Sequence, residues 1–149
     1  MESYHELTRL LERLHRRHLD VVRIDLAAEG IEDVTPAQAM LLMDIGEAEI
    51  SIRDLIERGY YLASTATYNI RKLAELGYVD QTRSPSDRRQ VRLKLTDRGL
   101  DLVARVRAGH PQVANAEGEE SDAWRERLAE AARTLRELER AWFDYVSFK

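Results

Sequence analysis

Hydrophobic positions recur at steps of three and four residues along the first part of the chain. Between residues 4 and 28 the recurring positions are Leu7, Leu10, Leu11, Leu14, His18, Val21, Val22 and Leu26. This spacing predicts one long amphipathic helix that ends near Gly30. The next segment, "VTPAQAMLLMDIG", predicts a short helix, because Thr35 can cap it, Pro36 suits its first position and Gly46 follows its end.

Two further short helices are predicted between residues 51 and 77. "SIRDLIERG" begins at a capping Ser51 and ends at Gly59, which leaves barely two turns. After "YYL", the pattern predicts a helix from about Ala63 to Leu76, which Gly77 terminates. The outward face of this helix is polar and carries Ser64, Thr65, Thr67, Tyr68 and Lys72.

The spacing changes to period two after this helix. "YVDQTR" and "QVRLKLT" alternate apolar and polar side chains on either side of "SPSD". We therefore expect a two-stranded antiparallel hairpin, with Val91, Leu93 and Leu95 facing inward.

The last third of the chain again has helical spacing. One helix is predicted from Thr96 and Asp97 to about Ala108, and "GHPQVANAEGEES" then predicts a linker because it contains Gly and Pro. A final helix is predicted from about Asp122 to Phe148. Its large apolar side chains repeat every seven residues, at Trp124, Ala131, Leu138 and Tyr145 in one row and Leu128, Leu135 and Trp142 in another.

Charge is distributed unevenly over these elements. The chain of 149 residues has a formal net charge of -4, but residues 51–99 carry 10 basic and 6 acidic side chains and are the one positive region. Much of this positive charge lies on the expected hairpin, in "RSPSDRRQVRLKLTDRG". An acidic protein with a basic hairpin is expected to use that hairpin to contact a polyanion.

Composition also narrows the class of protein. There is no cysteine, which excludes disulfides and thiolate zinc sites. The N-terminal "MESYHELTRLLERLHRRH" lacks the apolar core of a signal peptide, and apolar runs such as "AMLLM" are too short to cross a membrane. We therefore expect a soluble, cytoplasmic protein without a membrane partner.

Two short helices followed by a basic hairpin are typical of a winged helix-turn-helix. The second helix of the pair is the expected recognition helix, and short side chains near its N-terminus can reach base edges or phosphates in the major groove. Arginines at the hairpin tip suit phosphates or a narrow minor groove. The candidate contacts with double-stranded DNA are Ser64, Thr65, Thr67, Tyr68, Lys72, Arg88 and Arg89.

Asp87-x-Arg89 followed by Leu95-Thr96-x-x-Gly99 matches the D-x-R…L-T-x-x-G pattern of the MarR (multiple antibiotic resistance regulator) family of bacterial transcription factors. The chain resembles this family over nearly its whole length in the order of elements. The resemblance implies that Asp87 braces Arg89, which enters the minor groove, and that Thr67, Tyr68 and Lys72 contact DNA. Tyr68 stands where the family often has arginine.

A longer match suggests a subgroup. "RGYYLASTATYNIRKLAELGYV" together with "SPSDRR" resembles a subgroup similar to L,D-transpeptidase regulators, which are linked to envelope and stress genes.

The final helix carries an apolar stripe that one small winged domain cannot cover. A second copy of the chain is the natural cover, so we predict a homodimer that binds a pseudo-palindromic operator. The family resemblance implies the same dimer, formed by the first and last helices, and an effector pocket beneath the winged domain. Candidate pocket residues on the first two helices are His15, His18, Met40 and Met43.

We expect a single mainly α domain over residues 1–149, with a small β-hairpin wing. Residues 31–99 form the winged helix-turn-helix, and residues 1–30 and 100–149 serve dimerisation. The expected function is a sequence-specific transcriptional regulator, a repressor released by a small molecule. No cofactor or catalysis is expected, because the sequence has no Gly-rich phosphate loop, nucleophile elbow or HExxH motif.

Other interpretations remain open. The basic hairpin can be a solvated surface, Ser64 or Thr65 can serve only as an N-cap, and the final helix can pack within its own subunit. The winged fold can bind a protein instead of DNA. A metal-responsive regulator would use His15, His18 and His110.

Overall fold

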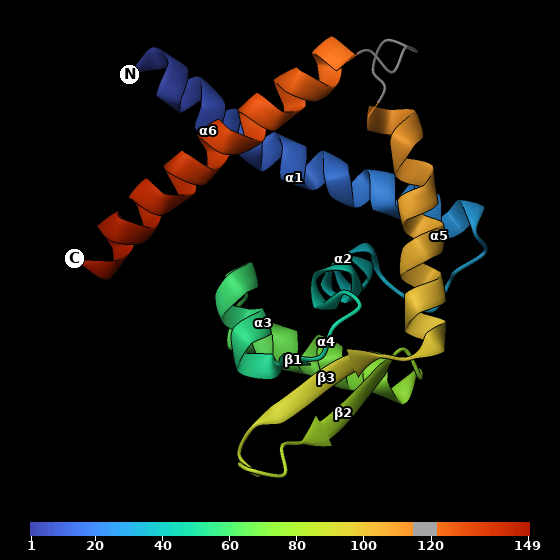
Figure 1. Ribbon diagram of the computed structural model, residues 1–149. Helices are drawn as coiled ribbons and strands as arrows, with labels where there is room; N and C mark the ends of the chain where they lie inside the picture. Colours follow the sequence, from blue (N-terminus) through green and yellow to red (C-terminus); the bar gives the residue numbers. More distant parts are fainter. Residues whose placement is uncertain (115–121) are drawn as a thin grey trace. The chain divides into compact units, whose positions relative to one another are not determined.

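The computed structural model describes residues 1–114 and 122–149, which form six helices and three short strands (Figure 1). The elements are α1 (Glu2–Ala28), α2 (Pro36–Ile45), β1 (Ile50–Ser51), α3 (Ile52–Gly59), α4 (Ala63–Glu75), β2 (Val79–Arg83), β3 (Val91–Leu95), α5 (Asp97–Ala114) and α6 (Asp122–Ser147). The fold is mainly helical and contains a winged helix-turn-helix, as the hydrophobic pattern predicted. It divides into two compact units, Met1–His110 and Pro111–Lys149. None of the described helices is both long and apolar enough to span a bilayer.

The starts of α2 and α3 follow the capping residues in the sequence. The Thr35 hydroxyl accepts a 3.2 Å hydrogen bond from the Gln38 amide, and the Gln38 side chain accepts one of 3.0 Å from the Thr35 amide. The Ser51 hydroxyl accepts a 3.0 Å bond from the Asp54 amide at the start of α3. These caps satisfy N–H groups that the first helical turn leaves without partners.

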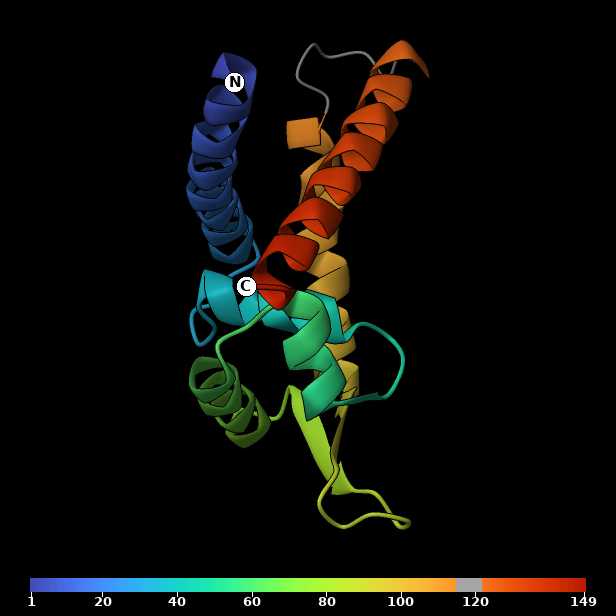
Figure 2. The same cartoon turned by 90° about the vertical axis from the view of Figure 1, so that its left-hand side faces the viewer.

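The sheet is antiparallel and has the strand order β1-β3-β2. The predicted hairpin pairs Val79 with Leu95 at its base and Arg83 with Val91 near its tip. The third strand, β1, was not predicted, because two residues are too few to show a period. It forms by pairing Ile50 with Leu93, a contact distant in sequence. The turn between β2 and β3 projects beyond α3 and α4 in both views (Figures 1 and 2).

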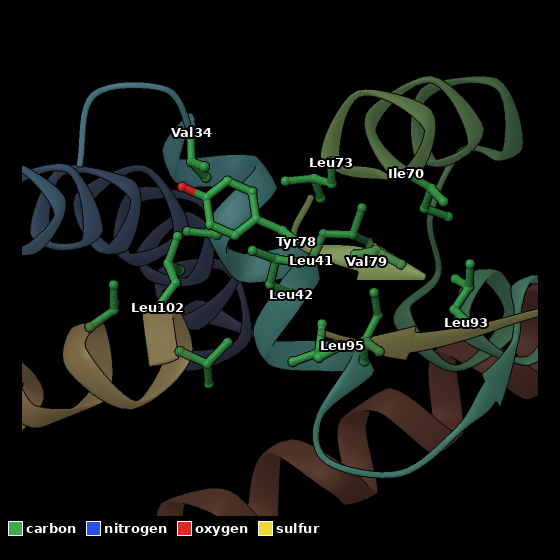
Figure 3. Packing of buried hydrophobic residues seen from close by; sticks show 14 of the residues in the cluster. Val34, Leu41, Leu42, Ile70, Leu73, Tyr78, Val79, Leu93, Leu95 and Leu102 are labelled. Carbon is green, nitrogen blue, oxygen red and sulfur yellow. The ribbon is translucent and has the colours of Figure 1, made fainter. Parts of the chain in front are cut away.

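The core of the first unit lies between the helices and one face of the sheet. Ile70 and Leu73 come from α4, Val79 and Leu93 from the strands, and all are at most 2% exposed. Figure 3 shows these side chains with Tyr78 and Leu102, so α4, the sheet and α5 share one apolar cluster. The recognition helix and the wing are therefore parts of one packed body.

The predicted break after residue 108 is wrong, because α5 continues to Ala114. Gly109 lies inside the helix. A Cβ on it would lie 2.7 Å from an Asp25 carboxylate oxygen, so glycine here permits α5 to approach α1 closely. The rest of the predicted linker, residues 115–121, lies outside the described residues.

The second unit contains α6, which matches the predicted helix closely. Two leucines of its apolar stripe are partly exposed, Leu128 at 44% and Leu135 at 36%, and α6 contains no buried residue.

Candidate nucleic-acid interface

The two faces of α4 differ as the sequence predicted. Ala66, Ile70 and Leu73 are buried against the core. Ser64, Thr65, Thr67 and Tyr68 are exposed, whereas Lys72 is half-exposed and lies 3.7 Å from the Glu75 carboxylate. The polar residues proposed for DNA contact thus share the solvent-facing side of one helix.

The start of α4 carries no side-chain cap. Its N-cap residue is Leu62, whose backbone is extended, so the alternative that Ser64 or Thr65 serves only as an N-cap does not hold. The helix begins before both residues, which places them inside its first turn. The first backbone N–H groups of α4 therefore have no side-chain cap, and this end carries the positive end of the helix dipole. Such a helix end can bind a phosphate.

Tyr68 lies beside two cations of the same helix. The Arg71 guanidinium is 5.7 Å and the Lys72 ammonium 5.8 Å from the centre of its ring. Sequence reasoning missed Arg71, although it lies three residues after Tyr68 and therefore next to it on the helix surface. The exposed face of α4 thus combines one aromatic ring with two positive charges.

The turn of the wing is held by backbone hydrogen bonds. The Asp87 carboxylate accepts a 3.0 Å bond from the Arg89 amide, and the Asp87 carbonyl accepts one of 3.0 Å from the Gln90 amide. The Ser84 amide donates to the Gln90 carbonyl at 3.0 Å, which closes the turn. Asp87 therefore braces the backbone of Arg89 and not its guanidinium.

Three arginines lie around this turn. Arg88 and Arg89 are exposed, and neither forms an ion pair with any residue that the structure describes. Arg83, which sequence reasoning did not single out, donates a 2.7 Å hydrogen bond to the Arg88 carbonyl. The tip therefore presents positive charge on a braced backbone.

The Leu95-Thr96-x-x-Gly99 motif joins the wing to α4 and α5. The Thr96 hydroxyl donates to the Gly77 carbonyl at 2.7 Å and accepts from the Gly99 amide at 3.1 Å. The Thr96 amide donates to the Tyr78 carbonyl at 3.1 Å. A Cβ on Gly99 would overlap that carbonyl, so glycine is required for this approach. The motif fixes the recognition helix relative to the wing.

None of the four candidate pocket residues lines either of the two cavities described below. His15 and His18 are exposed on α1, and Met40 and Met43 pack against the core from α2. A cavity of about 530 Å³ lies elsewhere, between the α1–α2 loop and α5, and has Glu29, Asp33, Arg98 and Arg105 among its lining residues. A smaller one of about 210 Å³ lies near Asp44 and Arg58.

The histidines proposed for a metal form a loose cluster. The rings of His18 and His110 are 5.8 Å apart, and Nε2 of His110 lies 3.6 Å from an Asp25 carboxylate oxygen. Although His18 is exposed overall, partial desolvation of its imidazole, and after it the neighbouring imidazoles His110 and His15, lowers the pKa of His18. Within the described residues no group of three or more such side chains is arranged to hold a metal ion.

The chain is similar to known DNA-binding proteins in sequence. Residues 34–99 match the family model of a winged helix DNA-binding domain. The exopolysaccharide II synthesis transcriptional activator ExpG of Rhizobium meliloti (strain 1021) is 39% identical over 140 residues, which are 94% of this chain and 72% of the relative.

Solved structures share the fold. A structure that gives the mechanism by which 6-hydroxynicotinic acid regulates DNA binding of Bordetella bronchiseptica BpsR matches with a TM-score of 0.69 and 22% identity, over 88% of this chain and 98% of that one. A mutant MarR from E. coli complexed with operator DNA matches with a TM-score of 0.65 and 22% identity, over 85% of this chain and 93% of that one. Both likenesses extend well beyond the winged domain.

Proposed function

The chain belongs to the MarR family of DNA-binding transcriptional regulators, and from this premise we propose that it binds a pseudo-palindromic operator as a homodimer. In this proposal α4 lies in the major groove and the wing follows the neighbouring minor groove. The observation that carries it is the junction at Thr96, which ties the exposed face of α4 to the arginine-bearing wing. The relatives named above are regulators of transcription and not enzymes.

Each candidate residue has a role that suits its chemistry. The uncapped start of α4, with Ser64 and Thr65, binds a phosphate, while Thr67 and Tyr68 face base edges. Lys72, together with Arg71, contacts the backbone on either side of the groove. Asp87 orients the wing, and the guanidinium groups of Arg88 and Arg89 contact the minor groove and its phosphates.

The homodimer is supported by exposed leucines on the apolar face of α6. Leu128 and Leu135 are each more than a third exposed, and apolar side chains in such a stripe are usually covered by a partner surface. Sedimentation equilibrium of the parent and of Leu135→Glu tests this part. We expect a dimer for the parent and monomers for the variant, and a monomeric parent would contradict the proposal.

The DNA contacts are tested by mobility shift with the DNA that flanks the protein's own gene and with duplexes selected from a random pool. We expect one retarded complex per operator, which Arg89→Ala weakens. Arg16→Ala, which removes an exposed arginine of α1, is the matched control and binds like the parent. Equal binding by Arg89→Ala and the parent would show that the wing assignment is wrong.

We also propose that a small molecule regulates DNA binding by this protein. It is supported by the likeness to BpsR, whose DNA binding is regulated by 6-hydroxynicotinic acid. The sequence favoured a repressor, whereas the relative ExpG is named a transcriptional activator. A reporter placed behind the selected operator decides the sign, because removal of a repressor raises its output and removal of an activator lowers it.

A further inference from the structure

Arg98 connects three segments that are distant in the sequence. Its Nη2 donates hydrogen bonds to the Asp33 carboxylate at 3.0 Å and to the Tyr78 hydroxyl oxygen at 3.1 Å. Its Nη1 donates to the Leu76 carbonyl. One guanidinium in the first turn of α5 thus reaches the loop before α2, the end of α4 and the residue before β2.

Tyr78 contacts both Arg98 and Asp33. Its ring is 4% exposed, and the Arg98 guanidinium lies 4.3 Å from the ring centre. Its hydroxyl donates a 2.8 Å hydrogen bond to the Asp33 carboxylate. Asp33 therefore receives hydrogen bonds from both partners, and the three side chains form a closed network.

The network contacts the C-terminal end of the recognition helix. Leu76 is the C-cap residue of α4, and its carbonyl belongs to the negative end of that helix. Nη1 of the guanidinium binds this carbonyl and so holds the end of α4 against α5. Nη2 binds Asp33 and so holds the α1–α2 loop. The end of α4 is thereby linked to the α1–α2 loop at Asp33, the residue directly before the matched DNA-binding region.

We propose that Arg98 is a positioning residue for DNA binding, which acts through Asp33 and Leu76 on the direction of α4 and does not contact DNA itself. This inference rests on the proposed function, because it concerns how the same surface is held.

The alternative role of Arg98 is a direct contact with a phosphate, since its side chain is 56% exposed. The two roles predict opposite effects of Asp33→Asn. Removing a carboxylate from an acidic protein strengthens its binding to DNA, or leaves it unchanged, if only charge matters. If Arg98 acts by position, the same change weakens binding, because Arg98 loses the partner that orients it.

The experiment measures the dissociation constant for a duplex selected in vitro, at several salt concentrations. The variants are Asp33→Asn, Arg98→Gln and the double variant. Because both side chains are partly exposed, we expect each single variant to weaken binding about threefold to fivefold. The double variant should be no weaker than the worse single variant, since one network is lost in all three.

The slope of affinity against salt separates the two roles. A positioning residue leaves this slope at the parent value, whereas a lost phosphate contact reduces it by about 0.9 per contact. Arg105→Gln is the matched control, because Arg105 lies two turns further along α5 and pairs with Glu29 at 2.8 Å, remote from α4. It should bind like the parent. The proposal is overturned if Arg98→Gln lowers the slope, or if Asp33→Asn binds as tightly as the parent.

Hydrogen exchange in the protein without DNA provides a readout that does not depend on the proposed function. Arg98→Gln should speed exchange of amides in residues 73–80, and Arg105→Gln should not. Unchanged exchange in Arg98→Gln would also overturn the proposal. A further outcome is that the parent protein binds no duplex while exchange is still faster in Arg98→Gln than in the parent. That result would contradict the proposed function, and it would contradict any role of this network in DNA binding.

Discussion

The Thr96 hydroxyl donates a 2.7 Å hydrogen bond to the Gly77 carbonyl, which joins the first residue after the wing to the first glycine after the recognition helix. Gly77 has a φ of 82°, a conformation that suits glycine and lets the chain leave α4 sharply toward β2. The two residues lie 19 positions apart in the sequence.

Replacing Thr96 by valine is expected to destabilise the protein. The change removes the donor to Gly77 and the acceptor for the Gly99 amide while keeping the side-chain shape. The bond to Gly77 is exposed and the bond from the Gly99 amide is partly buried, so we expect a loss of about 0.5 to 1.5 kcal/mol per bond. Urea denaturation measures this loss. Thr134→Val, which removes a hydroxyl that bonds only within α6, should change the free energy of unfolding far less.

Gly99→Ala tests the close approach between α5 and the residue before β2. The new Cβ would overlap the Tyr78 carbonyl, so the backbone must move, which costs about 1 to 3 kcal/mol or more. Thermal unfolding followed by circular dichroism measures the effect. The control is Gly30→Ala, where φ is 68° but nothing lies within 4 Å of a Cβ, so only local backbone strain is added. A Gly99→Ala protein as stable as the parent would refute the packing described here.

The sequence predicted the parts of the fold that depend on local patterns. Thr35, Pro36 and Gly46 defined α2, and the alternation at Val91, Leu93 and Leu95 defined β3, because caps and periods act within a few residues. β1 was missed because it exists only through pairing with Leu93. The break expected after residue 108 was wrong because Gly109 serves tertiary packing against Asp25, which overrides its low helix propensity.

The sequence also predicted the parts of the candidate DNA-binding surface that depend on local patterns. The polar face of α4 and the braced Asp87 turn followed from residue types and a motif. Arg98 was read only as a variable position within that motif, because its partners Asp33 and Leu76 come from other segments. Arg71 was missed although its position next to Tyr68 is local, and its basic charge was the available signal.

His18 is expected to make stability depend on pH. Its pKa is lowered from 6.5 in the folded protein, so below this pH the unfolded chain takes up a proton that the folded protein resists. Stability is therefore lost as pH falls through 6.5 toward the folded value, and His18→Gln should reduce that loss. Urea denaturation at pH values from about 7 to 5 measures it. His5→Gln, an exposed imidazole of the same helix, is the control, and equal pH dependence in all three proteins would contradict the prediction.

Asp87→Ala should weaken DNA binding although it removes a negative charge. The Asp87 carboxylate bonds to the Arg89 amide, and without it the wing backbone loses order that binding must restore. We expect about a threefold loss, smaller than that of Arg89→Ala, because only orientation is lost. Fluorescence anisotropy with a labelled operator measures both. Asp80→Ala removes an exposed carboxylate from β2 and should bind at least as tightly as the parent, so equal behaviour of the two aspartate variants would contradict a bracing role.

The central claim is that the exposed face of α4 and the tip of the wing contact one DNA duplex together, twice in each dimer. The most direct measurement is the dependence of operator affinity on salt for the parent, Arg71→Ala, Arg89→Ala and the double variant. The claim predicts that the affinity of the parent for the operator depends steeply on salt. Each single arginine substitution lowers the slope by about 1.8, because every contact occurs twice in the dimer, and the double variant lowers it by the sum of the two changes. A flat parent slope, or a slope that neither arginine alters, would contradict it.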